Sequence, residues 1–283
     1  MSRLLRHLLI GALIALCSLL QLHLLRMASP SLLDNLAYAS KMEWAGYHSR
    51  LLGFWLIRLC GGNYPVAIWI GLMLGGLLSW RLGGILGLVM YHACFGVWAS
   101  PWFQPWDILE PVTFIAFVLL VVEKARIGWI VALFAIAIFN LQSAMFIALW
   151  MLLSRHLIAG VSCTIFGIVV MWVLQHGNQP RFGIHHFQGL DGWSQCYTSD
   201  YAQSWVTENL RELTGVRGSV NWMALGVVLT IVATIIVVMH EQFALALTFA
   251  ALLGATIVFG IVNEMRVYLP FVPLLILGAK SLP

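Results

Sequence analysis

Charged side chains are scarce in this sequence. They make up 9% of its 283 residues, whereas an ordinary soluble domain carries about 25%. The sequence also lacks any dense run of Lys or Arg, so we expect no nucleic-acid partner. The few charges lie in short connections between apolar stretches, where they bear mainly on orientation in a bilayer.

Cysteine and histidine patterns typical of metal sites are also missing. Four of the five cysteines lie in apolar runs, and only Cys196 lies in a polar segment. This excludes a disulfide framework and a paired-cysteine metal site. His185 and His186 are adjacent, so their side chains point apart unless the loop folds back, and their spacing matches no zinc signature.

Hydrophobic residues dominate the composition of the sequence. Hydrophobic residues make up 61% of the chain, and the mean hydropathy is +0.92. Apolar runs long enough to cross a bilayer recur along the sequence, with no internal repeat. We therefore predict an all-α fold: a polytopic transmembrane helical bundle of about 8–10 membrane segments with short interfacial helices. It forms one integral membrane domain, residues 1–283.

The first apolar run, Leu8–Leu25, follows Arg3 and Arg6 and precedes no small-x-small cleavage site. We interpret it as a retained first helix with a cytoplasmic N-terminus. Later, Trp129–Leu153 either crosses once or breaks into two short helices at Asn140–Ser143. Positive charge mildly favours the single crossing. We adopt the break because of its polar residues, which places the following large loop outside the cytoplasm.

Two polar segments are longer than a connector requires. Residues 27–63 form the first polar loop, whose apolar part, Leu51–Leu59, is too short to cross and predicts an interfacial helix. Residues 176–219 form a large polar loop. Within it, Asp200 and Gln203 have the spacing of a helix cap and precede an amphipathic pattern.

Several side chains in these polar segments are candidates for chemistry. A carboxylate at the mouth of a bundle acts as a general base or holds a divalent metal, and interfacial charges without function are equally common. The second polar interruption, Pro101–Pro111, lies on the same membrane face as the first loop. The candidate catalytic residues are Asp34, Asp107 and Glu110.

Glu264 and Arg266 lie between two apolar runs with almost no loop. Ionisable groups near hydrocarbon depth are costly unless they are paired or face a wet cavity. Either both residues belong to a site, or they mark a polar turn at the lipid headgroups. The candidate substrate-binding residues are Tyr38, Tyr47, Arg50, Glu264 and Arg266.

Two short motifs resemble a known superfamily. Asp34, then Tyr38, then the stretch Gly46-Tyr47-His48-Ser49-Arg50-Leu51-Leu52 resemble the first loop of bacterial relatives of the C-type (GT-C) membrane glycosyltransferases. The stretch Asn263-Glu264-Met265-Arg266-Val267-Tyr268-Leu269-Pro270 is similar to the acidic-x-arginine-x-x-x-proline start of a late helix in those proteins.

The resemblance implies an enzyme of the bacterial inner membrane, or a degenerate relative of one. It would move a sugar from a polyprenyl-phosphate donor at the external face. Asp34 is the residue carried over as base or metal ligand, and Arg50 and Arg266 are the candidate phosphate contacts, which suits a bidentate guanidinium.

Two other classes of function remain open. One is a non-enzymatic scaffold subunit of a larger, cofactor-bearing complex with protein partners, in which His92 ligates a pigment or haem iron. A lone intramembrane histidine bonded to a neighbouring helix explains the same residue. The other is a transporter. Transporters typically have charged or broken helices near the middle of the bilayer, and few segments of this sequence show them.

Overall fold

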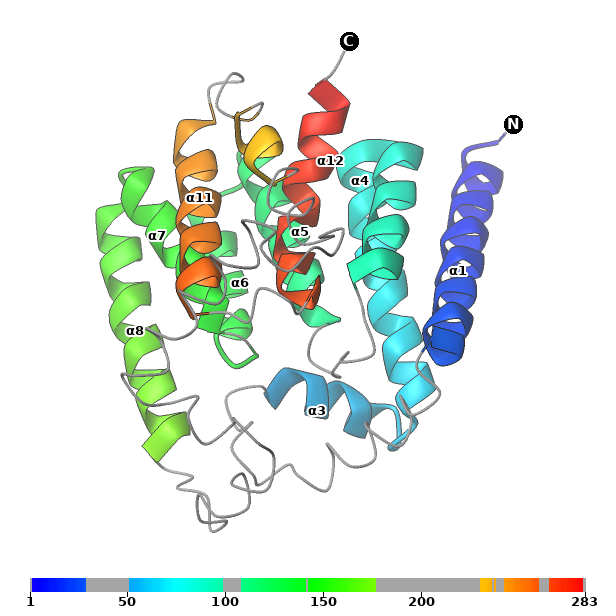
Figure 1. Cartoon of the computed structure of the whole chain (residues 1–283), viewed down its shortest axis with the longest axis horizontal. Helices are drawn as coiled ribbons and strands as arrows, with labels where there is room; N and C mark the ends of the chain where they lie inside the picture. The colour runs from blue at the N-terminus through cyan, green and yellow to red at the C-terminus, as the bar shows by residue number, and fades with distance from the viewer. Residues whose placement is uncertain are drawn as a thin grey trace, which may run out of the picture.

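The computed structural model describes residues 2–28, 51–98, 108–140, 142–176, 230–235, 237, 242–259 and 265–281, and all structural statements below concern these residues. Every regular element among them is a helix, as Figure 1 shows. The prediction of an all-α fold is therefore confirmed for this part of the chain. The helices stand roughly side by side, with one short helix lying across an end of the bundle.

The N-terminal part of the chain forms a helix packed on a helical hairpin. Helix α1 spans Arg3–Ala28, which includes the predicted apolar run Leu8–Leu25, and it packs against α4, Tyr64–Trp98. The chain reverses inside α4 at Gly84, whose φ of 62° and ψ of −142° are not helical. This reversal is the tight turn of the hairpin. Gly84 makes it because a residue without Cβ adopts positive φ at little cost.

The two arms of α4 approach closely because glycines line their contact. A Cβ on Gly87 would overlap the carbonyl oxygen of Ser79 in the opposite arm, and a Cβ on Gly75 would overlap the Tyr91 ring. Tyr91 is fully buried there. Such contacts bring the backbones of the two arms close together, as small residues do in pairs of membrane helices.

Alanine at Gly87 is expected to destabilise the fold by about 1–3 kcal/mol, because a backbone carbonyl cannot move aside as a side-chain tip does. The matched control is Gly11→Ala in α1, where a Cβ meets nothing within 4 Å. That change is expected to be neutral or stabilising by up to about 1 kcal/mol, since alanine favours helix. Thermal unfolding of both variants in detergent measures the difference, and equal melting temperatures would contradict the close packing of the hairpin.

The centre of the bundle is α5, Leu109–Val122, which buries most of its length. Around it lie α6, Ile127–Ala137, then α7, Met145–Leu153, and α8, Leu157–His176. Aromatic side chains fill the space between these helices. Phe117 of α5, for example, meets the Trp150 ring edge-on at 5.5 Å between centroids.

The chain breaks and turns back between α6 and α7. Ser143, just before α7, bonds Glu110 at the start of α5, and Trp150 packs on Phe117 two turns later in each helix. Helix α7 therefore runs in the same direction as α5. Helix α6 follows α5 through a tight turn and runs the opposite way. The predicted break of Trp129–Leu153 at Asn140–Ser143 is confirmed.

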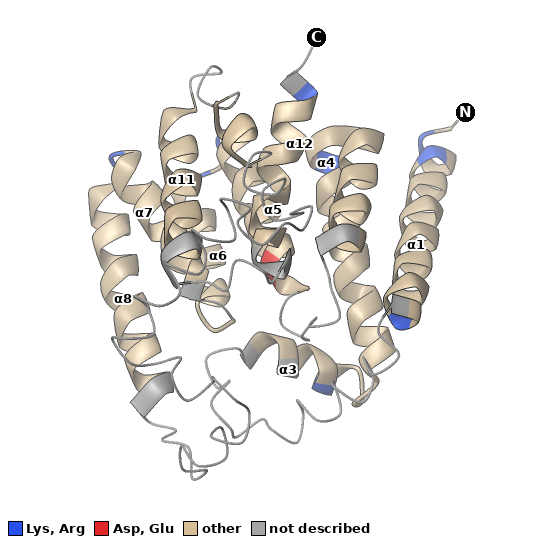
Figure 2. Ribbon diagram, in the orientation of Figure 1, with Lys and Arg blue, Asp and Glu red and all other residues tan. Residues whose placement is uncertain are grey.

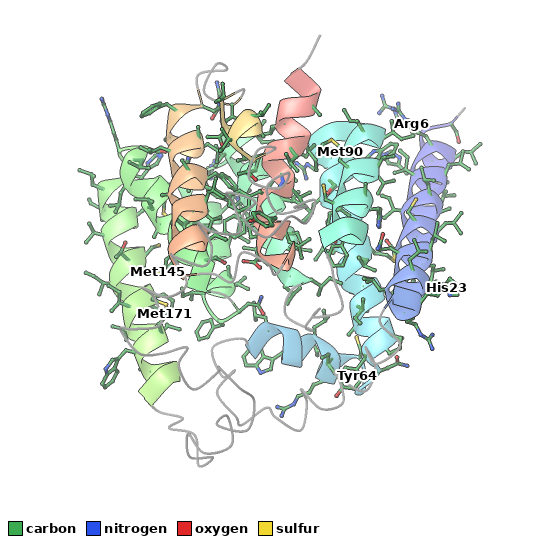
Figure 3. The ribbon with its side chains drawn as sticks, viewed as in Figure 1. Arg6, His23, Tyr64, Met90, Met145 and Met171 are labelled. Atoms are coloured by element: carbon green, nitrogen blue, oxygen red, sulfur yellow. The ribbon has the colours of Figure 1, made fainter. Side chains whose placement is uncertain are left out.

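Helix α8 runs back along α7. A Cβ on Gly160 would meet Leu152, and a Cβ on Gly167 would meet Met145, so the two helices are antiparallel. In Figure 3, Met171 near the end of α8 accordingly lies at the same end of the bundle as Met145.

The C-terminal elements close the bundle. Helix α11, Phe243–Phe259, is followed by a 3-10 helix, η4, Met265–Phe271, and by α12, Val272–Ser281. Residues 230–235 are also helical. Helix α12 packs against α4 and returns the chain to the hairpin turn, where the Lys280 ammonium donates to the carbonyl of Leu82 at 3.2 Å.

The helix across the end of the bundle is α3, Leu51–Leu59 (Figure 1). The apolar run in the first polar loop predicted this short helix, and it ends at Leu59, shortly before Gly61 and Gly62, both at positive φ. By length and composition, two of the described helices are candidates to cross a membrane, Arg3–Met27 and Tyr64–Gly96, with mean hydropathies of 2.3 and 1.6.

Candidate functional site

The candidate site lies at the end of the bundle that α3 crosses, which we call the α3 end and define by Gly53, Glu110 and Asn140. In Figure 3, His23 of α1 and Tyr64 of α4 lie at this end, whereas Arg6 and Met90 lie at the other. The two ends differ in their chemistry. Long polar segments leave from the α3 end, and short turns close the opposite end.

Glu110 is the predicted site carboxylate whose side chain the structure describes. It is half-buried in the first turn of α5, and the Ser143 hydroxyl donates to its Oε1 at 2.9 Å. A bond from a hydroxyl to a carboxylate is charge-assisted, and the N-terminal end of a helix favours negative charge. The bond fixes the carboxylate at the junction of α5 and α7.

The sequence placed Glu110 in the loop that precedes Pro111, and that placement is wrong. The helix begins at Leu109, so Glu110 and Pro111 both lie in its first turn. A proline fits there because the amide hydrogens of the first turn have no intrahelical acceptor. The carboxylate is therefore fixed on a rigid element.

Asn140 ties α3 to the middle of the bundle. Its side chain is fully buried, and its Oδ1 accepts a hydrogen bond at 3.3 Å from the backbone N–H of Gly53, 87 residues away in the sequence. Gly53 lies in the first turn of α3, where amide hydrogens lack helical partners. Asn140 therefore caps α3 from a different part of the chain.

Sequence reasoning used Asn140 only as a helix breaker and missed this contact. The available signal was an amide in an apolar run, because a buried amide is costly unless it is hydrogen-bonded. Its hydrogen-bond partner, the backbone N–H of Gly53, cannot be recognised from a single sequence.

The C-terminal motif reaches the start of α5. Phe249 of α11 contacts Phe114, one turn after Glu110, and Phe271, the last residue of η4, at ring-centroid distances of 5.8 and 5.9 Å. Arg266 lies near the start of η4. The backbone of the C-terminal motif and the carboxylate of Glu110 thus belong to packed neighbouring elements.

Most other predicted site residues lie outside the described part of the chain. The structure fixes the helices next to them: α3 begins directly after Arg50, and α5 begins two residues after Asp107. The predicted residues that lie outside the described ranges are Asp34, Tyr38, Tyr47, Arg50, Asp107 and Glu264. The predicted amphipathic helix within residues 176–219 also lies outside them.

The opposite end, which we call the basic end, is held together by polar contacts between turns. The Arg81 guanidinium donates two bonds of 2.7 Å to the Glu123 carboxylate, which joins the hairpin turn of α4 to the end of α5. Both side chains are largely exposed, so the pair contributes little to stability. Figure 2 shows Lys and Arg gathered mainly at this end.

A divalent metal was one of the ligands considered from the sequence. Among the described side chains, no three His, Cys, Asp or Glu residues come together in a group that could hold a metal ion. Glu110 with Ser143 supplies one carboxylate and one hydroxyl, so a metal there would need ligands from the neighbouring polar segments.

No protein-family model, curated protein or solved structure matches the chain. The likeness to GT-C enzymes therefore rests on the two motifs of the sequence.

Proposed function

We propose that the protein is a polytopic membrane enzyme, a GT-C-like glycosyltransferase or a degenerate relative, that acts on a polyprenyl-phosphate-linked sugar at its α3 end. One observation carries the proposal. The described helices next to the first-loop, second-loop and C-terminal candidate residues all meet at that end, around Glu110 and Asn140.

The outer surface of the bundle supports a membrane location. Leu16 of α1 is 65% exposed, and Ile158 and Ile165 of α8 are 87% and 58% exposed. Large apolar side chains on outward faces of several helices are unfavourable in water and favourable against lipid. The shorter helices α5 and α7 lie inside this shell and need not cross a bilayer by themselves.

The distribution of charge supports an orientation. Short loops rich in Lys and Arg stay in the cytoplasm. The basic end carries most of the described Lys and Arg residues, whereas Arg26, Arg58 and the segment containing Arg266 lie toward the α3 end. We assign the basic end to the cytoplasm, and the candidate site is then external.

Cysteines at the two ends of the bundle test this orientation. Asn63 is exposed in the turn after α3, and His156 is exposed in the turn between α7 and α8. In a background without native cysteines, a membrane-impermeant thiol reagent applied to intact cells is expected to label Asn63→Cys and to spare His156→Cys. Labelling after cell lysis should reach both. The reverse pattern in intact cells would place the site in the cytoplasm.

The chemistry at this end divides among three groups of residues. The resemblance gives Asp34 the role of general base or metal ligand. Arg50 and Arg266 bind the donor phosphate, since a guanidinium fork matches phosphate oxygens. Glu110 is a fixed negative charge at the junction of α5 and α7, suited to orienting a sugar hydroxyl or to completing a metal site.

Substitution of Glu110 separates a site role from a structural one. Glu110→Gln keeps the size and one acceptor oxygen but loses the charge, so sugar transfer is expected to fall by about tenfold or more, within the range of charge-assisted contacts. Ser143→Ala removes only the supporting hydroxyl and is expected to have a smaller effect. Transfer is measured with a radiolabelled polyprenyl-phosphate sugar and a membrane extract as acceptor. Unchanged transfer in Glu110→Gln would leave the carboxylate as a packing group.

Purification also distinguishes the enzyme hypothesis from the scaffold hypothesis. An enzyme of this kind is expected to purify alone in mild detergent, with a lipid-phosphate retained. Stoichiometric copurification with other chains and no bound polyprenyl phosphate would favour a scaffold subunit.

A further inference from the structure

A second polar cluster lies between α1 and α4, within apolar helices and away from the Glu110 junction. We call it the α1–α4 seam and define it by Ser18, Gln21 and His92. Ser18 is fully buried, and Gln21 is 4% exposed. His92 is partly exposed as a residue, yet both of its ring nitrogens are covered, so the ring turns its nitrogens inward.

The three residues lie along the contact between α1 and α4. His92 Nε2 lies 3.4 Å from the Cβ position of Gly76, and Ile14 of α1 lies 3.1 Å from the same point. One turn further on, the Gln21 amide lies 3.6 Å from the Cβ position of Gly96. Ser18 lies between Ile14 and Gln21 on α1. Because Gly76 and Gly96 carry no Cβ, the imidazole and the amide lie close to the backbone of α4.

Four polar atoms in this seam have no hydrogen-bond partner in the described part of the chain: Ser18 Oγ, Gln21 Nε2, His92 Nδ1 and His92 Nε2. More than nine in ten buried polar groups in proteins are hydrogen-bonded, because an unmade bond costs the full desolvation of the group. The neighbouring side chains include Ile14 and Leu88, each 2% exposed, and the Tyr91 ring, which meets the His92 ring edge-on at 5.1 Å. None of the described neighbours bonds these four atoms, so a polar molecule is what would offset the cost.

We propose that the seam is a binding site for water, one or a few molecules that bridge α1 to the α4 hairpin. The donors and acceptors match. Water accepts a hydrogen bond from the Gln21 amide and donates one to the unprotonated imidazole nitrogen, and the Ser18 hydroxyl does either. An internal water needs two to four polar partners, and the seam supplies three side chains.

Larger or charged ligands fit the seam poorly. Ile14 Cγ2 and Leu88 Cδ1 lie 3.1 and 3.2 Å from the Cβ position of Gly76, which leaves no space for a macrocycle beside His92. A cation would need carboxylate, thiolate or several imidazole ligands, and the Gln21 Nε2 is a donor only. The pigment-binding interpretation of His92 is thus less favoured than a hydrated seam, which holds α1 in register whatever reaction the α3 end performs.

The direction in which apolar substitutions in the seam change the melting temperature tests the proposal. If water satisfies the seam, Gln21→Met and His92→Phe each break its bonds and are expected to lower the melting temperature of the full chain in detergent by about 2–4 °C or more. If the atoms are merely unsatisfied, the same apolar replacements raise it. The matched control is Thr248→Val, since the Thr248 hydroxyl already donates to the Ala244 carbonyl at 2.8 Å within its own helix.

Spectroscopy of the unsubstituted protein provides a second measurement that does not depend on variants folding. With ¹⁵N-histidine labelling, the His92 ring N–H is expected to show magnetisation transfer from water, assigned by its loss in His92→Asn. Absence of that transfer, or higher melting temperatures in Gln21→Met and His92→Phe, would overturn the proposal. Transferase activity is not part of either measurement, so failure here leaves the proposed function untouched.

Discussion

Replacement of Asp34 by Asn is expected to lower sugar transfer by about 10²–10⁴-fold, the usual effect of losing a general base. The reason is chemical: an amide neither accepts the proton of an attacking hydroxyl nor holds a cation strongly. The fold should be unaffected, because the core that the structure describes is built by helices α4 to α8, α11, η4 and α12. The measurement is single-turnover transfer from a radiolabelled polyprenyl-phosphate sugar.

Two further variants make this result interpretable. Glu123→Gln is the matched control, since it removes a carboxylate at the basic end, away from the candidate site. Melting temperatures equal to that of the unsubstituted protein would show that Asp34→Asn acts on chemistry. Full transfer by Asp34→Asn would remove Asp34 from the mechanism and shift the role of base to Asp107 or Glu110.

Substitution of Arg266 by Lys is expected to weaken donor binding by about tenfold or more, although the positive charge is kept. A guanidinium makes two parallel bonds to phosphate, and an ammonium acts as a point charge. The structure supports this role because η4, which contains Arg266, packs beside the start of α5. The expected signature is a raised KM for the lipid-linked donor with a smaller change in kcat.

Arg58→Lys is the control for this prediction. Arg58 lies in the last turn of α3, at the same end of the bundle but outside both sequence motifs. It is expected to change the donor KM less than Arg266→Lys does. Equal effects in the two variants would indicate general attraction of a lipid phosphate by positive charge, and no effect in either would contradict the assignment of Arg266.

The sequence predicted those parts of the fold that depend on local chemistry. Polar residues inside an apolar run located the break between α6 and α7, and the short run Leu51–Leu59 located α3. Both features can be recognised from a single sequence. Polar groups are unfavourable in hydrocarbon, and a short apolar run cannot cross a bilayer.

Features that depend on contacts between distant segments were not predictable in this way. Several glycines in the sequence of α4 could form the turn, and only the packing of the two arms places it at Gly84. The cap that Asn140 gives to Gly53 joins residues 87 apart. The place of Glu110 inside α5 was missed because Pro111 marks the end of the polar segment in the sequence, although a proline also fits the first turn of a helix.

Photocrosslinking of the donor lipid tests the central claim most directly. A polyprenyl-phosphate sugar that carries a diazirine near its phosphate is irradiated with the purified protein, and the labelled peptides are mapped by mass spectrometry. The account predicts labelling of peptides from the α3 end, in and next to α3, the start of α5 and η4, with competition by unlabelled polyprenyl phosphate. Labelling confined to the turns of the basic end, or labelling that polyprenyl phosphate does not compete, would contradict it.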